Sequence, residues 1–443
     1  MTARGLIVAA SRSGSGKTTV TLGLLAALKR GGIAVRASKA GPDYIDPAFH
    51  AAATGAASIN LDSWAMPPGL LDVLAGEAAR TAELLVIEGV MGLFDGVAGS
   101  PGRTGSTADL ATCLGLPVLL VLDVSGQSQT AAAVVRGLAG HDPGVRIAGV
   151  VLNRIGSERH RALVEDAIDA LGIPVLGAVP RDEALAMPER HLGLVQAQEH
   201  GDLTAMLDRL ADMAQRHLDL DRIATMAAPL RFAIASHRAA LSPPGQRIAV
   251  AADPAFTFFY PHLRDGWRRA GGEIVTFSPL ADEPPPHDCD ACWLPGGYPE
   301  LHAGRLASAH RFREGLRRFG ATRPVHGECG GYMVLGEGLE DAQGTRHAMA
   351  GLLGHATSFA TRKLHLGYRE ARLLADGVLG RAGSMVRGHE FHYATLISPG
   401  ADEAFLELTD TQGQLLGGAG GRRGHVSGTF FHAIAQVQGR PAS

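Results

Sequence analysis

The chain has 443 residues, more than one typical domain holds, so two domains of roughly 200 residues each are expected. Apolar residues make up 46% and charged residues 19%, a composition that supports packed cores and excludes general disorder. The net charge of −3 and the aromatic content of 5% argue against nucleic acid as a partner, because they indicate neither a basic face nor stacking platforms.

Membrane insertion and disulfide bonding are both disfavoured. No apolar run approaches the ~18 residues that span a bilayer, and the first residues lack a full secretory signal, so a cytoplasmic protein is expected. The cysteines are too few for a disulfide framework. Cys289 and Cys292 form a C-x-x-C pair. No second pair or nearby histidines at ligand spacing accompany it, so ordinary packing is favoured over a metal or redox role.

The first part of the chain alternates short apolar runs with helical patterns. The predicted buried strands cover residues 6–10, 84–87, 117–122, 147–152 and 175–179. Helices are predicted at residues 18–29 and 128–138. This alternation predicts an α/β fold with a doubly wound, mostly parallel sheet, in which ligands bind at the carboxyl ends of the strands.

A change of pattern separates the two halves. Residues 203–226 have an amphipathic helical pattern, and residues 236–246 contain Leu-Ser-Pro-Pro-Gly, which cannot continue a helix. A new strand begins at Arg247, and a second strand–helix alternation follows. We therefore predict a P-loop domain at residues 1–200, a helix and linker at 201–245, and a second α/β domain at 246–443.

A phosphate-binding loop follows the first predicted strand, where Ser-Arg-Ser-Gly-Ser-Gly-Lys-Thr-Thr precedes a helix. Glycines let the backbone wrap around phosphate oxygens, Lys17 can reach the terminal phosphates, and the Thr18 hydroxyl can ligate Mg²⁺. The predicted ATP-binding residues of the loop are Gly14, Ser15, Gly16, Lys17, Thr18 and Thr19. Ser11 stands where the usual pattern has its first glycine.

Further polar residues stand where a nucleotide and metal site could be completed. Glu88 follows an apolar strand, where a carboxylate can face the phosphates. Asp43 and Asp46 share one loop that contains Pro and Gly, and their spacing favours a functional role and an ordinary turn about equally. Asn153 ends another strand, where it could read an adenine edge or cap the next helix.

A cysteine elbow marks the second half. Residues 325–333 read Val-His-Gly-Glu-Cys-Gly-Gly-Tyr-Met, and Gly-x-Cys-x-Gly places Cys329 on a sharp strand-to-helix turn. The helix N-terminus is expected to lower the pKa of this thiol. The backbone amides of Gly330 and of Gly297, in a second Gly-Gly turn, are the expected oxyanion donors. His432, at the end of a strand-like run, is the expected general base.

Together these residues resemble class I glutamine amidotransferases fused to a dethiobiotin-synthetase-like P-loop domain. More closely, the chain is similar to the cobyrinic or hydrogenobyrinic acid a,c-diamide synthases of cobalamin biosynthesis. The matching stretches run across nearly the whole chain and cover residues 14–23, 39–47, 60–64, 88–96, 294–300, 326–333 and 387–393. The resemblance implies that residues 246–443 form the class I glutamine amidotransferase domain.

The resemblance also implies an activity. ATP would activate the a and c acetate carboxylates of a corrinoid as acyl phosphates, which ammonia released from glutamine would displace. ATP and glutamine are then co-substrates, with Mg²⁺ as cofactor, and a homodimer is one expected assembly. Cys329 and His432 carry over as the glutaminase pair. The other implied sites are the Mg²⁺ ligands Thr18, Asp46 and Glu88, the base-recognition residue Asn153, and the corrinoid contacts Asp43, Tyr44 and Asp95.

Two positions depart from the family pattern. Most class I glutaminases follow the histidine with Pro-Glu, whereas Ala433 and Ile434 follow His432, so the group that orients the imidazole is left open. Arg12 stands where deviant P-loop ATPases often carry a second lysine, which raises an intersubunit role. Separately, a His-Glu-Phe-His cluster at residues 389–392 is interpreted as a hydrogen-bonded cluster rather than a metal site.

Other functions remain as alternatives. The same reaction on cobalt-containing cobyrinic acid is one, although the overall family match, notably at residues 60–66, favours the cobalt-free acid. Cobyric acid synthases usually have a P-loop that ends in Val-Gly-Lys-Ser, whereas this chain has Ser-Gly-Lys-Thr-Thr. Nucleotide synthases keep the His-Pro-Glu ending that is absent here. A P-loop ATPase switch with an inert glutaminase-like domain is the alternative from another class, but an inert domain would not need the intact elbow at Cys329.

Overall fold

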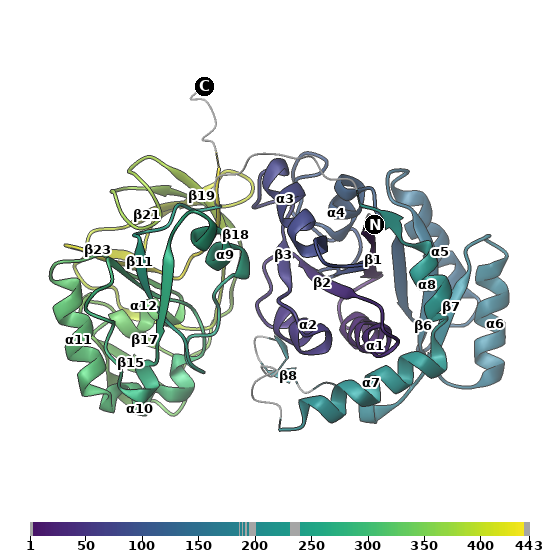
Figure 1. The fold of residues 1–443 in the computed structure, drawn as a ribbon, viewed down its shortest axis with the longest axis horizontal. Coiled ribbons are helices and arrows are strands. Elements are labelled where there is room, and N and C mark those ends of the chain that lie inside the picture. Colours follow the sequence, from purple (N-terminus) through teal and green to yellow (C-terminus); the bar gives the residue numbers. More distant parts are fainter. Residues whose placement is uncertain are drawn as a thin grey trace. The chain divides into compact units, whose positions relative to one another are not determined.

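The computed structural model describes residues 3–185, 187, 189–190, 193–194, 201–230 and 240–437. The chain divides into two compact units, residues 1–236 and 237–443 (Figure 1). Within the described ranges, no helix is both long and apolar enough to cross a membrane.

The first unit is built on a parallel sheet. Its strands are β1 (Arg4–Ala10), β2 (Val35–Ala40), β3 (Ile59–Leu61), β4 (Leu84–Glu88), β5 (Val118–Asp123), β6 (Ile147–Ile155) and β7 (Val175–Pro180). They lie in the order β3-β2-β4-β1-β5-β6-β7, and the short β10 (Ala228–Pro229) pairs antiparallel with β1. Strands β4 and β5 are buried along their whole length, which explains their continuous apolar runs. The predicted mostly parallel α/β sheet is confirmed.

Helices connect these strands (Figure 1). They are α1 (Lys17–Arg30), α2 (Asp46–Thr54), α3 (Pro68–Ala79), α4 (Thr107–Leu114), α5 (Thr130–His141), α6 (Glu158–Asp169), α7 (Leu203–His217) and α8 (Leu220–Met226). A two-residue pair, β8 (Glu189–Arg190) and β9 (Gly193–Leu194), precedes α7. Parallel strands place the carboxyl ends of β1, β2, β4 and β6 along one edge of the sheet, and the predicted site residues of this unit lie at or after these ends.

The helical segment predicted at residues 203–226 forms two helices. Leu218 is extended and bridges to Gly177 of β7, and Asp219 then caps α8 by accepting the amide of Arg222. α7 packs closely on α1, because a Cβ on Gly23 would lie 2.7 Å from the carbonyl oxygen of Leu210. Both helices therefore belong to the first compact unit.

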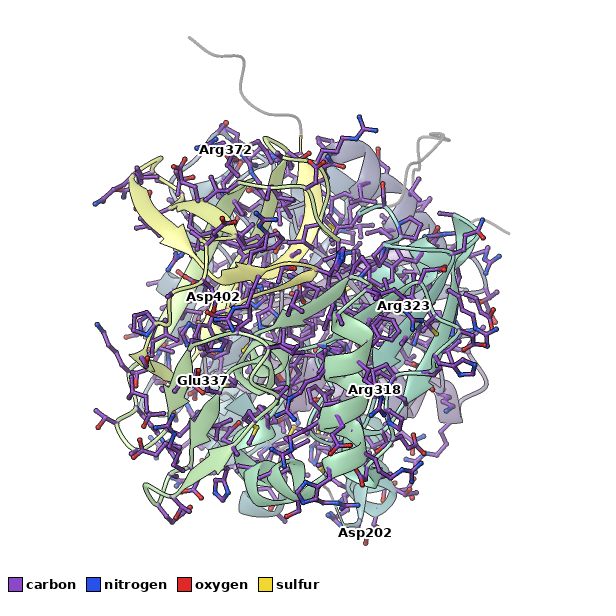
Figure 2. The ribbon with its side chains drawn as sticks, turned by 90° about the vertical axis from the view of Figure 1, so that its left-hand side faces the viewer. Asp202, Arg318, Arg323, Glu337, Arg372 and Asp402 are labelled. Atoms are coloured by element: carbon purple, nitrogen blue, oxygen red, sulfur yellow. The ribbon has the colours of Figure 1, made fainter. Side chains whose placement is uncertain are left out.

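The second unit has its own parallel sheet, in the order β12-β11-β13-β14-β24, with β23 added antiparallel at the edge. Its strands are β11 (Arg247–Ala251), β12 (Glu273–Phe277), β13 (Ala291–Leu294), β14 (Val325–Glu328), β23 (Gly421–Arg423) and β24 (Val426–Thr429). Its helices are α9 (Pro261–Arg269), α10 (Ala303–Ser308), α11 (His310–Gly320) and α12 (Gly330–Leu335). Charged side chains cover the outside, and Arg318 on α11 is 73% exposed (Figure 2).

Two further sheets complete the second unit, and the strand–helix alternation did not predict them. One has the order β22-β21-β18-β19-β25, all antiparallel, and the other has the order β16-β15-β17-β20. The strands are β15 (Gly338–Glu340), β16 (Arg346–Ala348), β17 (Ala356–Ser358), β18 (His365–Leu373), β19 (Met385–His392), β20 (Thr395–Ser398), β21 (Leu406–Thr409), β22 (Leu415–Ala419) and β25 (His432–Val437). Several are only half-buried, so they lack the apolar runs of the parallel strands.

Candidate functional site

The P-loop connects β1 to α1, and its backbone is held from the opposite side by Asn153. Gly16 caps α1 with φ 87°, a left-handed conformation that favours glycine. The Asn153 amide donates to the carbonyl oxygen of Ser15 at 2.8 Å, and the Ser15 hydroxyl donates to that of Arg12 at 3.0 Å. These contacts hold the loop in its turn with the α1 N-terminus facing the anion position.

Replacing Gly16 with Ala is expected to weaken ATP binding about 10-fold or more, because a left-handed alanine costs about 1–2 kcal/mol. In addition, a Cβ there would lie 2.1 Å from Nδ2 of Asn153. Gly32→Ala is the matched control, since Gly32 has a similar φ of 85° but no atom within 4 Å of a Cβ. Calorimetric titration with ATP should separate the two variants. Equal affinities in both would contradict the assigned loop geometry.

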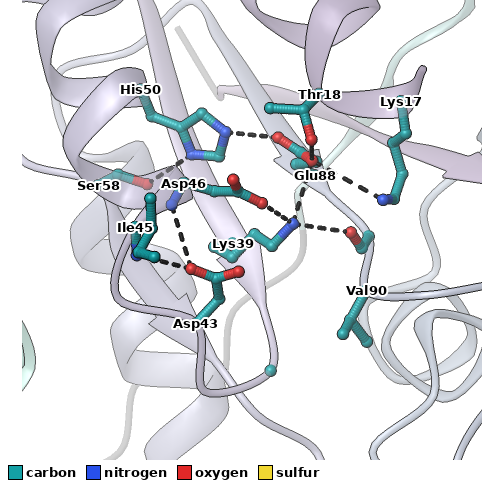
Figure 3. Close-up of polar contacts among 12 residues, drawn as sticks. Lys17, Thr18, Lys39, Asp43, Ile45, Asp46, His50, Ser58, Glu88 and Val90 are labelled. Carbon is teal, nitrogen blue, oxygen red and sulfur yellow. Dashed lines mark hydrogen bonds and ion pairs between the residues drawn. The ribbon is translucent and has the colours of Figure 1, made fainter. Parts of the chain in front are cut away.

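Glu88 is the centre of a buried polar cluster beneath the P-loop (Figure 3). It ends β4 and is fully buried. Its carboxylate accepts hydrogen bonds from the Thr18 hydroxyl at 2.7 Å and from Lys39 at 3.0 Å, contacts Nε2 of His50 at 2.7 Å, and lies 3.8 Å from Nζ of Lys17. Burial opposes its ionisation, but the Lys39, His50 and Lys17 side chains outweigh burial and hold the pKa of Glu88 well below its usual range.

Lys39 lies between two carboxylates of this cluster (Figure 3). Its Nζ is 2.6 Å from Asp46 and 3.0 Å from Glu88, and it also donates to the carbonyl of Gly89 at 3.1 Å. Burial would lower the pKa of Lys39, but Asp46 and Glu88 raise it above its usual value. Burial and the neighbouring Asp43 raise the pKa of Asp46 to about 6. The ammonium group therefore marks this position as one that attracts cations.

The proposed Mg²⁺ ligands Thr18, Asp46 and Glu88 converge on this cation position. Their oxygen atoms are the hard donors that Mg²⁺ prefers, and Mg²⁺ usually takes only one or two carboxylates and completes its shell with waters and phosphates. Across the part of the chain that the structure describes, no group of three or more His, Cys, Asp or Glu side chains suits a metal by itself. The residues fit a metal that binds together with a nucleotide.

The sequence analysis did not assign Lys39 or His50 to the site. Lys39 lies within a stretch on which the family resemblance rests, and it is a charged residue among the small residues at the end of β2. His50 lies on α2, with Nδ1 3.2 Å from the Ser58 hydroxyl and Nε2 against Glu88. Nothing in its local sequence marks it, because its partner is 38 residues away.

The predicted corrinoid contacts make local turn interactions. Asp43 accepts the amides of Ile45 at 2.6 Å and Asp46 at 3.1 Å, which starts α2. Asp95 accepts the amide of Gly92 at 2.8 Å and is exposed. Tyr44 is half-buried in the same loop as Asp43. The loop of Asp43 follows β2, and the loop of Asp95 follows β4, the strand beside β1. Both loops lie at the edge of the sheet that carries the P-loop, while the contacts themselves are local turn contacts.

In the second unit, Cys329 lies on the strained turn between β14 and α12. Its φ of 46° and ψ of −103° are unusual for a residue with a side chain, as a nucleophile elbow requires. The turn has no room for a side chain at Gly331, because a Cβ there would lie 2.0 Å from the carbonyl oxygen of Leu294. A Cβ on Gly330 would lie 3.0 Å from the amide nitrogen of Gly297. The structure thus brings the two predicted oxyanion donors together.

His432, the first residue of β25, lies beside the thiol. A Cβ built on Gly296 would lie 2.6 Å from Cε1 of His432 and 3.4 Å from Cβ of Cys329, so the ring and the thiol border the same point. Both side chains are buried. The structure therefore assembles the predicted nucleophile and base from segments about 100 residues apart in the sequence.

The expected lowering of the Cys329 pKa is wrong for this structure. Burial raises the pKa of the thiol, and the nearby Glu300 carboxylate raises it further, while the hydrogen bond from the Gly330 amide opposes both. Burial also lowers the pKa of His432 well below its usual value. Both directions favour the uncharged forms, a thiol at Cys329 and a neutral imidazole at His432.

Comparison with known proteins agrees with both halves. Residues 6–195 match the CobQ/CobB/MinD/ParA nucleotide binding domain, and residues 247–439 match the CobB/CobQ-like glutamine amidotransferase domain. The chain is 64% identical over 437 residues to the hydrogenobyrinate a,c-diamide synthase of Mesorhizobium japonicum, covering 99% of this chain and 100% of that protein. The chain belongs to the hydrogenobyrinate a,c-diamide synthase family.

Two further members of the hydrogenobyrinate a,c-diamide synthase family match over almost their whole length. The protein of Agrobacterium fabrum is 62% identical, with 98% of this chain and 100% of that protein covered. The protein of Rhodobacter capsulatus is 54% identical, with 98% of this chain and 99% of that protein covered.

Arg12 forms an ion pair within its own chain. Its Nη2 lies 2.8 Å from Oδ2 of Asp123 at the end of β5, and Nη1 of Arg154 lies 2.5 Å from the same oxygen. Burial raises the pKa of Asp123, but the Ser125 hydrogen bonds and Arg154 lower it below its usual value. This contact does not test the intersubunit role of Arg12, which stays a prediction.

The two other groups that the sequence singled out are the cluster at residues 389–392 and the C-x-x-C pair. His392 contacts the carbonyl of Ala394 at 3.0 Å, and Arg369 binds Glu390 at 2.7 Å, as the hydrogen-bonded interpretation predicted. Cys289 and Cys292 are buried free thiols. Burial raises the pKa of both thiols, so neither favours the thiolate that redox or metal chemistry needs.

Acidification is expected to destabilise the second unit, because its buried histidines are neutral. Burial lowers the pKa of His326 to about 3 and that of His262 to about 4. The unfolded chain binds these protons near pH ~6.5, so stability is present above that pH and is lost as the pH falls toward the folded values, by about 1.4 kcal/mol per pH unit for each histidine. Thermal unfolding at pH 7.5 and 5.5 measures the loss.

A matched pair of variants tests whether His326 causes the pH dependence of stability. His326→Asn can keep a contact with Ser427, which lies 2.9 Å from Nδ1 of His326, and should reduce the pH sensitivity. His425→Asn, at an exposed neighbouring position, should leave it unchanged. An equal pH slope in the parent and in His326→Asn would show that His326 ionises normally in the folded chain.

Proposed function

We propose that this chain amidates the a and c carboxylates of hydrogenobyrinic acid, using ATP and glutamine, through acyl phosphate intermediates. One observation carries the proposal. A chain that matches hydrogenobyrinate a,c-diamide synthases end to end also contains two assembled reactive centres, one around Lys17, Thr18 and Glu88 and one around Cys329 and His432. A chain that used only one of these centres would not need the other.

The ATP-dependent half converts a poor electrophile into a good one. A carboxylate resists attack because it is negatively charged and lacks a leaving group. Transfer of the γ-phosphoryl group of ATP to the substrate carboxylate oxygen gives an acyl phosphate and ADP. Lys17 and the α1 N-terminus offset the charge on the transferred phosphoryl group. Mg²⁺, held through Thr18, Asp46 and Glu88, would supply further charge neutralisation.

The glutaminase half supplies ammonia. The Cys329 thiol attacks the carboxamide carbon of glutamine while His432 accepts the thiol proton. The amides of Gly330 and Gly297 bind the resulting oxyanion. His432 then returns the proton to the leaving nitrogen, which gives ammonia and a thioester, and water hydrolyses the thioester to glutamate. Ammonia attacks the acyl phosphate, and inorganic phosphate leaves as the amide forms.

The substrate contacts form part of the same proposal. Asp43, Tyr44 and Asp95 would contact the corrinoid, and Asn153 would contact the adenine in addition to holding the P-loop. We place the enzyme in the cytoplasm, where ATP and glutamine are available. The observations that support these roles are the position of the residues at strand ends near the P-loop and their match to the family motifs.

Mass spectrometry of the products tests the function. The protein is incubated with ATP, Mg²⁺ and glutamine, with hydrogenobyrinic acid and cobyrinic acid in separate tubes. We expect the diamide from the metal-free acid. A diamide from cobyrinic acid only would keep the mechanism and reverse the substrate. No amide from either acid, with glutamine intact, would overturn the proposal in favour of an ATPase switch.

A further inference from the structure

The group that orients His432 is missing from the position where class I glutaminases usually carry it. Ala433 and Ile434 follow His432, and both are buried apolar residues of β25. An imidazole that accepts a thiol proton on one nitrogen works best when its other nitrogen is held by an acceptor, which fixes the tautomer and the ring plane. The acceptor must therefore come from another segment.

Glu328 is the carboxyl group that faces this segment. It is the last residue of β14 and immediately precedes Cys329. Its Oε1 accepts the backbone amide of Ala433 at 3.0 Å, and its Oε2 lies 3.8 Å from Nδ1 of His432. Both side chains are 2% exposed. One carboxyl group thus spans the backbone and the ring of the same short stretch.

The ring of His432 is also positioned by its other neighbours. His389, its cross-strand partner on β19, stacks on it with ring centroids 4.9 Å apart and an interplanar angle of 15°. The Cε1 edge faces the position above Gly296 that the Cys329 side chain also borders. Nδ1 is the ring nitrogen that faces Glu328, and we assign the thiol proton to Nε2.

We infer that Glu328 is the positioning residue for His432, replacing the glutamate that is absent after the histidine. This inference rests on the proposed glutaminase function. The 3.8 Å separation is longer than a hydrogen bond in the resting chain, and catalytic contacts of this kind often tighten when substrate binds. Oε1 accepts the Ala433 amide, and Oε2 is the oxygen that faces His432.

Burial raises the pKa of Glu328 to about 8. A protonated carboxyl group still has an oxygen that accepts the Nδ1–H of His432, so the orienting role holds in either ionisation state. An amide at this position is different, because it offers one acceptor and places a donor against the second N–H. Glu328→Gln is therefore a size-matched variant that breaks one of the two contacts.

The test measures glutaminase kinetics in the full chain. Glu328→Gln should lower kcat about 10- to 100-fold and leave KM within about 2-fold, because a positioning residue acts on the proton transfer and not on glutamine binding. Glu328→Asp, which keeps both acceptors but shortens their reach, should fall between. Glu314→Gln, at an exposed position on α11, is the control and should match the parent.

A double variant separates positioning from folding. If Glu328 acts through His432, adding Glu328→Gln to His432→Ala should lower the residual rate no further. A full additional loss, or a loss expressed mainly in KM, would overturn the inference. The rate of Cys329 alkylation by iodoacetamide, measured in the parent, Glu328→Gln, His432→Ala and the double variant, gives the coupling even if glutamine is not hydrolysed. Ammonia-dependent amidation of hydrogenobyrinic acid then reports separately on the proposed synthase function.

Discussion

Cys329→Ala is expected to lower glutamine-dependent amidation by about 10³-fold or more and to leave ammonia-dependent amidation within about 2-fold. The thiol is the only nucleophile that the elbow presents, so its loss removes the thioester route completely. The ATP-dependent half does not use the thiol, and external ammonia at high pH replaces the product of the glutaminase. Product analysis with each nitrogen source measures both rates.

The matched control for Cys329→Ala is Cys292→Ala, which removes a buried thiol of the same unit that lies on β13 and not at the elbow. The folded fraction of Cys292→Ala should keep both the glutamine-dependent and the ammonia-dependent activity. Ammonia supporting turnover no better than glutamine in Cys329→Ala would show that the two half-reactions cannot be separated.

Glu88→Gln should abolish amidation with either nitrogen source and destabilise the first unit by about 3 kcal/mol. The carboxylate is the common partner of Thr18, Lys39 and His50, and its neutralisation leaves the buried ammonium of Lys39 with less compensation. Glutaminase turnover, measured by glutamate release, should persist wherever the second unit stays folded. Chemical denaturation and amide formation are the two measurements.

A double variant distinguishes charge balance from chemistry at Glu88. Adding Lys39→Met removes the uncompensated ammonium, so part of the lost stability should return, because replacing both members of a buried pair costs less than removing one. Amidation should stay absent, since the oxygen ligand and the cation are both gone. Recovery of amidation in the double variant would contradict a role for Glu88 in the site.

Short motifs whose residues are contiguous were predictable. The P-loop depends on the left-handed conformation of Gly16, and the Cys329 elbow depends on neighbouring glycines that leave room for the turn. Each turn joins a strand directly to a helix, so its geometry is encoded locally. The parallel sheet of each unit was also predictable, because strands buried on both faces leave continuous apolar runs in the sequence.

The α/β class and, with the family resemblance, the kind of reaction were therefore predictable from the sequence, which also marks the phosphate loop and the Cys329 elbow. The distant side chains that complete each centre were not predictable, because they are brought together only in the folded chain. Lys39 meets Glu88 because β2 lies beside β4, and His50 reaches the same carboxylate from α2. Glu328 approaches His432 across 104 positions in the chain. Such contacts depend on strand order and register, to which no local pattern is sensitive. The raised pKa of Cys329 has the same origin, because burial is a property of the packed fold and not of the elbow sequence.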